Sequence, residues 1–517
     1  MFLFKRFREN QQGSFAVVFA LLLVPLLGVV GVAIDYSRAF EMRTKLAEAL
    51  DAGVLAVGAQ PNIGQAAAFN IVNDWIVAQL GDQYPEHWQL DSVTVGNDGI
   101  VNASASGTVN TTMARIIGVR QMPITVTTQA IRSLGKVEVV LVLDNTGSMR
   151  GAKLAKLKDA AKSLVDDLVN ATKDPNDLKI ALVPFSQTVN VGSQYQNASW
   201  MDNQAASSIH DDIFTKANGA VYTGTNRFTL FSAMNVDWGG CVESRPYPYD
   251  VTEAPPTAAT PDTLYVPYFA PDEPDSRRKS RRKNGRFGAF YNDYLTDKEY
   301  SRSDWKIPQG YPDKYIGQTP KSGTSPVGYK YGPNAGCEIA PLQRLTTNSS
   351  KVKSAINAMT AAGDTNIPFG LAWGRHVLSP EKSPFGDGVE YDSDEWIKVI
   401  VLMTDGNNHN TTTGNRNDSL YSGVGYIWQN RLGVGAGSSI RNRTSAMDER
   451  LTELCTDIKN TSIEIYTMRV EVNSGSSAVL RGCASETDMF YEVQNAADLT
   501  NVFAKIGGSI QTLRLTK

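Results

Sequence analysis

The apolar residues of this chain form one long uncharged run near the N-terminus. Two regions follow in which the pattern of apolar and polar positions differs. Residues 15–34 are 20 consecutive positions without a charge, about the length that crosses the roughly 30 Å hydrocarbon core of a bilayer as a helix. Asp35 follows directly, without a small-x-small cleavage site, so we predict an uncleaved transmembrane anchor and not a signal peptide. Helical spacing of apolar residues continues over 36–59, which predicts that the helix extends beyond the membrane.

The region after the anchor has the pattern of a small α+β unit. Residues 66–80 show helical periodicity. Alternating apolar and polar residues then predict strands at 92–95, 100–109 and 124–131. We therefore divide the first part of the chain into a tail, anchor and helical extension over 1–60 and a stalk domain over 61–134.

From residue 135 strands alternate with helices, which predicts a doubly wound, mainly parallel α/β sheet of about six strands. The runs at 137–143 and 397–403 are almost continuously apolar, as in strands buried on both faces. The other strands are expected at 180–185, 463–470 and 489–493, and helices near 154–168, 351–362, 446–459 and from 497 onward. Residues 190–345, rich in Tyr, Pro, Asn, Gly and Ser, interrupt this pattern and are either an insertion with its own structure or partly disordered.

Composition narrows the possible chemistry. Lys and Arg number 50 against 53 Asp and Glu, a net charge of -3, so the chain has no overall field that would gather nucleic acid. Its four histidines include no pair at metalloprotease spacing, which leaves few candidates for zinc or histidine chemistry. A basic run at 277–283 follows acidic residues within the insertion, and we interpret it as a solvated, partly self-neutralised loop.

The four cysteines help to indicate the cellular compartment in which most of the chain lies. They allow three disulfide connectivities, and their order along the chain favours pairing Cys241 with Cys337 and Cys455 with Cys483. Buried free thiols are the alternative. The basic residues flanking the anchor are balanced, but long domains translocate largely regardless of charge, and an even number of cysteines suits an oxidising space. We expect the bulk of the chain outside the cytoplasm.

Three polar loops are predicted to meet at one edge of the sheet. Asp144, Thr146 and Ser148 follow the first core strand, and Asp405 follows the strand at 397–403. Thr365 lies in a third polar loop before a helix. Ligands bind open α/β sheets at the carboxyl ends of strands, and carboxylate and hydroxyl oxygens suit Mg²⁺, with Mn²⁺ or Ca²⁺ as alternatives. These residue types also cap helices and form turns, so a domain that binds no ion is the competing interpretation.

The same residues carry a resemblance to a known family. Asp-x-Thr-x-Ser at 144–148, the Thr at 365 and Thr-Asp-Gly at 404–406 resemble the von Willebrand factor A domain, over roughly 136–517 apart from the insertion. The resemblance implies a metal-ion-dependent adhesion site. In it the three hydroxyls contact the metal or lie close to it, and the two aspartates act directly or through water. An open coordination position would accept an acidic side chain of a protein partner, so a binding module without catalytic residues is implied.

The N-terminal segment carries a second resemblance. Gly13 and Ser14, the apolar span, the sequence Ala-Ile-Asp-Tyr at 33–36 and the Ala-rich helix after it are similar to the TadE/TadG-like region of tight-adherence (Flp) pilus-assembly proteins. Val18 stands five residues after Gly13, where prepilins have Glu, so an accessory protein and not a pilus subunit is expected. The resemblance implies a single-pass protein of the bacterial inner membrane. Its partners would be other pilus-assembly components and membrane lipid, and no nucleic acid.

Two other functions remain open from the sequence. A generic envelope adhesion protein would need the same anchor and metal site. A strand followed by Asp-x-Thr-Gly-Ser also resembles phosphotransferases that form an aspartyl-phosphate. The soluble phosphatase version would need a second carboxylate at position 146, which is Thr, and the ion-pump version would need many more membrane spans than one. No activating lysine is evident near Asp405.

Overall fold

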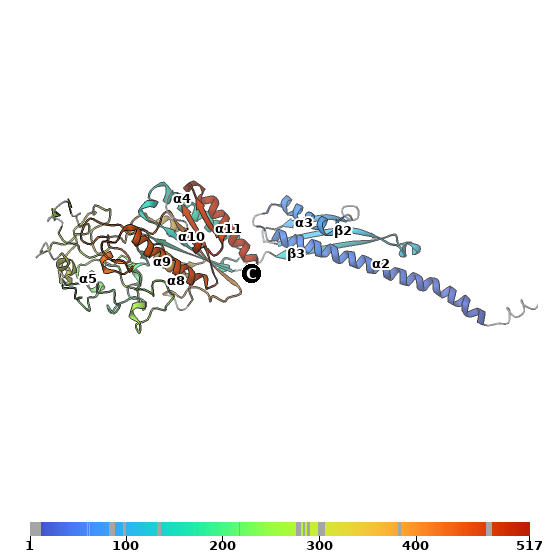
Figure 1. The fold of residues 1–517 in the computed structure, drawn as a ribbon. Helices are drawn as coiled ribbons and strands as arrows, with labels where there is room; N and C mark the ends of the chain where they lie inside the picture. The colour runs from blue at the N-terminus through green and yellow to red at the C-terminus, as the bar shows by residue number, and fades with distance from the viewer. Residues whose placement is uncertain are drawn as a thin grey trace, which may run out of the picture. The chain divides into compact units, whose positions relative to one another are not determined.

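The computed structural model divides into two units, Met1–Leu134 and Gly135–Leu515, which are described separately. The structure describes residues 12–58, 60, 63–81, 88–96, 100–131, 136–172, 174–216, 218–275, 281–282, 285–286, 290–297, 305–380, 384–471 and 478–516. Figure 1 shows both units, each with helices beside a sheet.

The first unit is a long helix packed on a small antiparallel sheet. Helix α2, Gln12–Gly58, continues well past the apolar run, as predicted, and contains Pro25. Within the described chain, it is the one helix long and apolar enough to cross a membrane. Its described side chains between residues 18 and 34 are largely exposed, whereas Leu46, Leu50 and Val54 farther along are buried. The rest of the unit comprises α3 (Gln65–Leu80), η2 (Ala114–Ile117) and the strands β1 (Trp88–Val95), β2 (Ile100–Asn110) and β3 (Gln121–Ile131).

The second unit is built on a mixed, mostly parallel sheet of eight strands in the order β13-β12-β11-β4-β5-β6-β7, with β10 also paired to β5. Its parallel strands are β4 (Lys136–Asp144), β5 (Leu178–Phe185), β11 (Trp396–Thr404), β12 (Ile463–Val470) and β13 (Phe490–Val493). The predicted fold class is confirmed. The estimate of about six strands missed the antiparallel strands β6 (Val189–Asn190), β7 (Cys241–Val242) and β10 (Gln343–Thr346), which are too short to show a period.

Helices cover both faces of this sheet (Figure 1). On β4, Val139 and Leu141 belong to one hydrophobic core and Val140 and Val142 to the other, which explains the continuous apolar run. The first core includes residues of α4 (Ala152–Asn170), α7 (Ser349–Ala358) and α11 (Leu499–Thr516). The second includes residues of α8 (Ile367–Leu378), α9 (Ile440–Lys459), α10 (Ala478–Cys483) and the insertion.

Three charged residues lie side by side within the central strands. Glu138 on β4 is the register partner of Lys398 on β11 and of Lys179 on β5. Its carboxylate lies 2.6 Å from the Lys398 ammonium and 2.9 Å from that of Lys179. Burial lowers the pKa of the Lys398 ammonium, and the charge of Glu138 opposes this shift. Because a register slip would separate these groups, the pair favours one alignment of the strands.

We predict that Glu138→Leu lowers the free energy of unfolding by about 3–5 kcal/mol, because it leaves the buried Lys398 ammonium without its counter-charge. The double variant Glu138→Leu/Lys398→Met should lose much less, since neither charge remains. Urea unfolding at neutral pH measures both, with Lys179→Met as the control because that side chain is more exposed. Equal losses in the single and double variants would contradict the assignment.

The described part of the insertion is folded and shares a core with the sheet. It contains η5 (Ser193–Tyr195), α5 (Arg227–Ala233), η6 (Pro261–Thr263), α6 (Lys306–Gly310) and η7 (Pro312–Tyr315). Tyr265, Tyr268 and Phe269 are buried in the core that also contains residues of β4 and α8. Of the basic run at 277–283, the described residues include only the short strand β8, Arg281–Arg282, so its interpretation stays a prediction.

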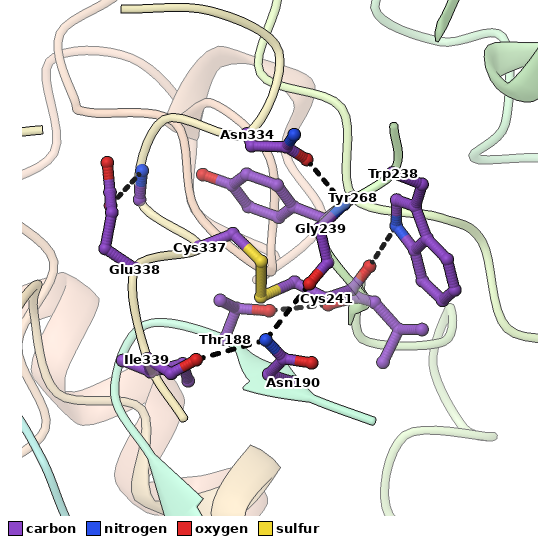
Figure 2. The surroundings of a disulfide bond; sticks show 12 residues. Thr188, Asn190, Trp238, Gly239, Cys241, Tyr268, Asn334, Cys337, Glu338 and Ile339 are labelled. Carbon is purple, nitrogen blue, oxygen red and sulfur yellow. Dashed lines mark hydrogen bonds between the residues drawn. A yellow bond between two sulfur atoms is a disulfide. The ribbon is translucent and has the colours of Figure 1, made fainter. Parts of the chain in front are cut away.

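The two ends of the insertion meet beside β5. We call this place the neck; it consists of Asn190, Gly239, Ile339 and Leu342. The Leu342 amide donates to the Asn190 carbonyl at 2.8 Å. The Asn190 side-chain amide donates to the carbonyls of Gly239 and Ile339, both at 3.1 Å. Figure 2 shows the two bonds of the Asn190 side chain next to the disulfide between Cys241 and Cys337. A second disulfide joins Cys455 of α9 to Cys483 of α10. This is the pairing that cysteine order favours.

Loss of either disulfide should destabilise the protein through the entropy of the unfolded chain. With a sequence separation of 28 between Cys455 and Cys483, the chain-entropy model predicts that Cys455→Ala/Cys483→Ala lowers the free energy of unfolding by about 3.6 kcal/mol. For Cys241→Ala/Cys337→Ala, with a separation of 96 residues, it predicts about 4.7 kcal/mol. Urea unfolding measures the loss, and non-reducing peptide mass mapping checks the pairs. Free thiols in protein isolated from the envelope would contradict both.

Candidate metal centre

The predicted site residues lie at the carboxyl edge of two neighbouring strands. In the parallel pair β4 and β11, Leu143 is the register partner of Met403, so Asp144 and Thr404 end adjacent strands. The loop after β4 continues through η3 (Gly147–Met149) into α4, and the loop before α8 contains Thr365. Parallel pairing therefore brings together loops that lie more than 200 residues apart in the sequence.

Asp144 is fully buried and held on both sides of its carboxylate. Oδ1 accepts a hydrogen bond from the Thr146 amide at 2.8 Å. Oδ2 accepts one from the Thr404 hydroxyl at 2.6 Å. The side chain is thus fixed by its own loop and by the neighbouring strand.

A short chain of hydrogen bonds links the remaining motif residues. The hydroxyls of Thr146 and Ser148 lie 2.8 Å apart. The Ser148 hydroxyl donates to Oδ1 of Asp405 at 2.6 Å. Four of the five predicted residues, Asp144 among them, therefore form one cluster of oxygen atoms at the sheet edge.

Thr365 reaches the same edge through its loop. The Gly147 amide donates to the Gly363 carbonyl at 2.9 Å, which ties the Thr365 loop to the Asp144 loop. A Cβ atom added at Gly406 would lie 3.9 Å from the Thr365 hydroxyl, so that hydroxyl is next to the loop that contains Asp405. The neighbouring Asp364 is engaged elsewhere, since its carboxylate accepts bonds from the amide and hydroxyl of Thr411.

Lys153 is a site residue that the sequence interpretation missed. Its ammonium donates to Oδ2 of Asp405 at 2.7 Å and lies 3.6 Å from Glu471. The expectation that no lysine lies near Asp405 is therefore wrong. The signal was its position in the first turn of α4, from which a long side chain can reach back over the strand ends.

The surroundings of Asp144 make its negative charge unfavourable. Burial, and next the negative charge of Asp405, raise the pKa of the Asp144 carboxyl to about 6, against the opposing effect of its hydrogen bonds. Within the described chain, no group of three or more His, Cys, Asp or Glu side chains is arranged to hold a metal. The donors of this cluster are instead two carboxylates and hydroxyls, a set that fits a hard cation of the Mg²⁺ type.

We predict that Asp144→Asn stabilises the cation-free protein at neutral pH. An unfolded Asp ionises near pH 3.9, whereas folded Asp144 ionises near pH 6. Unfolding between these values releases a proton, so this group makes stability fall as pH rises from about 4 to about 6. Asn has no charge to bury, and the variant should be more stable by roughly 1–3 kcal/mol at pH 7 in EDTA.

Urea unfolding in EDTA at neutral pH and near pH 4 tests this expectation. Asp394→Asn is the matched control, because Asp394 is exposed and lies outside the cluster. The gain for Asp144→Asn should nearly vanish near pH 4. A loss of stability at both pH values would contradict the assigned cost of the buried charge.

Comparison with solved structures gives remote likenesses. The von Willebrand factor domain of the type V pili tip protein Mfa5 from Porphyromonas gingivalis is 12% identical over 73% of this chain and 95% of its own, with a TM-score of 0.32. The PilB minor pilin from Streptococcus sanguinis is 10% identical over 83% and 78%, with a TM-score of 0.32. Mussel byssus protein PTMP1 with a zinc-occupied MIDAS motif is 11% identical over 74% of this chain and 48% of its own, with a TM-score of 0.29. No curated protein matches significantly.

Family models match two separate parts of the chain. Residues 13–60 match the Flp pilus-assembly TadE/G-like family. Residues 138–233 match the von Willebrand factor type A domain. Both are non-enzymatic families, in agreement with the expectation of a binding module. The chain carries both domains, and this combination is that of a TadG-like Flp pilus-assembly protein.

Proposed function

We propose that this protein is a membrane-anchored, cation-dependent binding module of Flp pilus assembly. Asp144, Thr146, Ser148, Thr365 and Asp405 would hold a divalent cation, with Mg²⁺ as the preferred ion. The bound cation would offer a coordination position to an acidic side chain of a protein partner among the other pilus components. The family combination supports the role in assembly.

The observation that carries the metal proposal is the hydrogen-bonded cluster at the edge of β4 and β11. Asp405 accepts a bond from the Ser148 hydroxyl, which lies against the Thr146 hydroxyl. Asp144, from a loop distant in sequence, accepts a bond from the Thr146 amide. Lys153 pairs with Asp405, so a divalent ion would have to displace this ammonium from the carboxylate or share the carboxylate with it. An ion bound between the two loops would relieve the repulsion between Asp144 and Asp405.

The proposed location is the bacterial inner membrane, with α2 as a single-pass anchor and the von Willebrand domain outside the cytoplasm. Most of the described apolar side chains between residues 18 and 34 of α2 are exposed, as a lipid-facing helix requires. Two disulfides in the second unit suit an oxidising compartment. A generic envelope adhesion protein remains the second candidate, because it would use the same anchor and cluster.

Thermal unfolding of the full chain in detergent, in EDTA and then in excess Mg²⁺, tests the metal proposal. Ligand at about 100 times its dissociation constant stabilises a folded protein by roughly 2.7 kcal/mol, so the transition of the second unit should move to higher temperature. The shift should disappear in Asp405→Asn and persist in Asp394→Asn.

Mn²⁺ and Ca²⁺ are tested in the same way, because both also take oxygen ligands. An equal shift in the wild type and in Asp405→Asn would exclude this cluster as the site. The absence of a shift with all three ions would mean that the domain serves as a scaffold without a cation.

A further inference from the structure

The connection between β2 and β3, residues 111–120, forms a hairpin tip with an unusual surface. Its side chains include Ile116 and Ile117, which are 83% and 63% exposed, and the partly exposed Met113 and Val119. Exposed apolar side chains gathered in one short loop indicate a surface that is covered in the working protein.

The hairpin tip is fastened to helix α2 at the residue that ends the apolar run. The Asp35 carboxylate, which is buried, accepts hydrogen bonds from the amides of Met113 and Ala114, both at 2.7 Å, and from that of Thr112 at 3.0 Å. Arg38 also donates to the Thr112 hydroxyl at 3.2 Å. These bonds fix the level of the hairpin tip along the helix.

A close contact extends the attachment into the apolar run itself. A Cβ atom added at Gly31 would lie 2.4 Å from the Cβ of Met113, so the glycine makes room for this side chain. Gly31 precedes Asp35 by four residues, which is about 6 Å along a helix. Met113 therefore lies level with the last turn of the segment that would cross the membrane.

The charges of the hairpin tip suit a lipid surface. Residues 111–120 contain Arg115 and Arg120, both exposed, and no Asp or Glu. Arginine side chains near the end of a membrane-spanning helix can extend toward headgroup phosphates, while apolar neighbours enter the acyl region. The combination of apolar and basic residues is typical of segments that lie in the membrane interface.

We propose that the hairpin tip dips into the leaflet at which α2 leaves the membrane. Ile116 and Ile117 enter the boundary between headgroups and acyl chains, and Arg115 and Arg120 meet headgroup phosphates. The small sheet is then held at the bilayer at two points, the helix and the hairpin tip. This inference rests on the proposed membrane anchoring, and it adds lipid as a direct ligand of the stalk.

Site-directed fluorescence in vesicles tests the proposal. The four native cysteines are paired in disulfides, so Ile117→Cys in the full chain supplies a single thiol for an environment-sensitive probe. The protein is reconstituted in phosphatidylcholine and phosphatidylglycerol vesicles with doxyl quenchers placed either near the headgroup or deep in the acyl chain. Leu26→Cys reports on the anchor, and Asn102→Cys on β2, about 26 Å along the strand from the hairpin tip, reports on water.

The probe at 117 should show blue-shifted emission and strong quenching by the shallow quencher, the probe at 26 quenching by the deep one, and the probe at 102 neither. Quenching at 26 without quenching at 117 would overturn the proposal and leave the anchor intact. No quenching at 26 would instead refute the anchoring on which the proposal rests. Blue-shifted emission at 117 without lipid quenching would mean that a protein covers the hairpin tip, which also overturns it.

A matched pair of glycine variants tests whether the contact with α2 sets the position of the hairpin tip. Gly31→Leu should displace Met113 and reduce shallow quenching at 117 while leaving quenching at 26 unchanged. Gly28→Leu is the control, because a Cβ at Gly28 would meet nothing within 4 Å. Equal quenching at 117 in both variants would show that the contact with α2 does not set the position of the hairpin tip.

Discussion

The alignment of β4 with β11 is the constraint on which the candidate site depends. Glu138 and Lys398 face each other near the start of the two strands, and Asp144 and Thr404 end them. A slip of one residue would turn every side chain of a strand to the opposite face. It would leave a buried charge unpaired and separate Asp144 from the hydroxyl that holds it. The ion pair and the oxygen cluster therefore depend on the same alignment of β4 with β11.

The two units use charged groups in the same way, to fix backbone geometry beside an apolar surface. Asp35 accepts backbone amides of a loop far along the sequence, and Asp144 accepts an amide and a hydroxyl at the sheet edge. In each case the carboxylate satisfies donors that would otherwise be left unpaired. Membrane anchoring and cation binding would thus both rely on preformed loops, with little ordering left for the moment of binding.

Periodicity predicted the longer elements that bury one regular face, and continuous apolar runs predicted β4 and β11, which are buried on both faces. Because the carboxyl ends of neighbouring parallel strands lie at the same edge of a sheet, the sequence also predicted that Asp144 and Asp405 would lie close together. The short strands β6, β7 and β10 had no such signal, since their pairing depends on how the insertion folds back. Lys153 was missed because its contact with Asp405 depends on where α4 begins. The contact of Asp35 with the hairpin tip joins residues 77 positions apart and has no local pattern.

The neck affects how the sequence of this domain can evolve. Because the Leu342 amide bonds to the Asn190 carbonyl beside the disulfide, the polypeptide leaves and rejoins the sheet at nearly one point. Doubling the length of a flexible loop costs only about 0.6 kcal/mol of closure entropy. Natural variants can therefore lengthen or shorten loops beyond the neck, provided that Tyr265, Tyr268 and Phe269 keep their place in the core shared with β4 and α8. Partner preference could diversify in those loops without any change in the residues of the oxygen cluster.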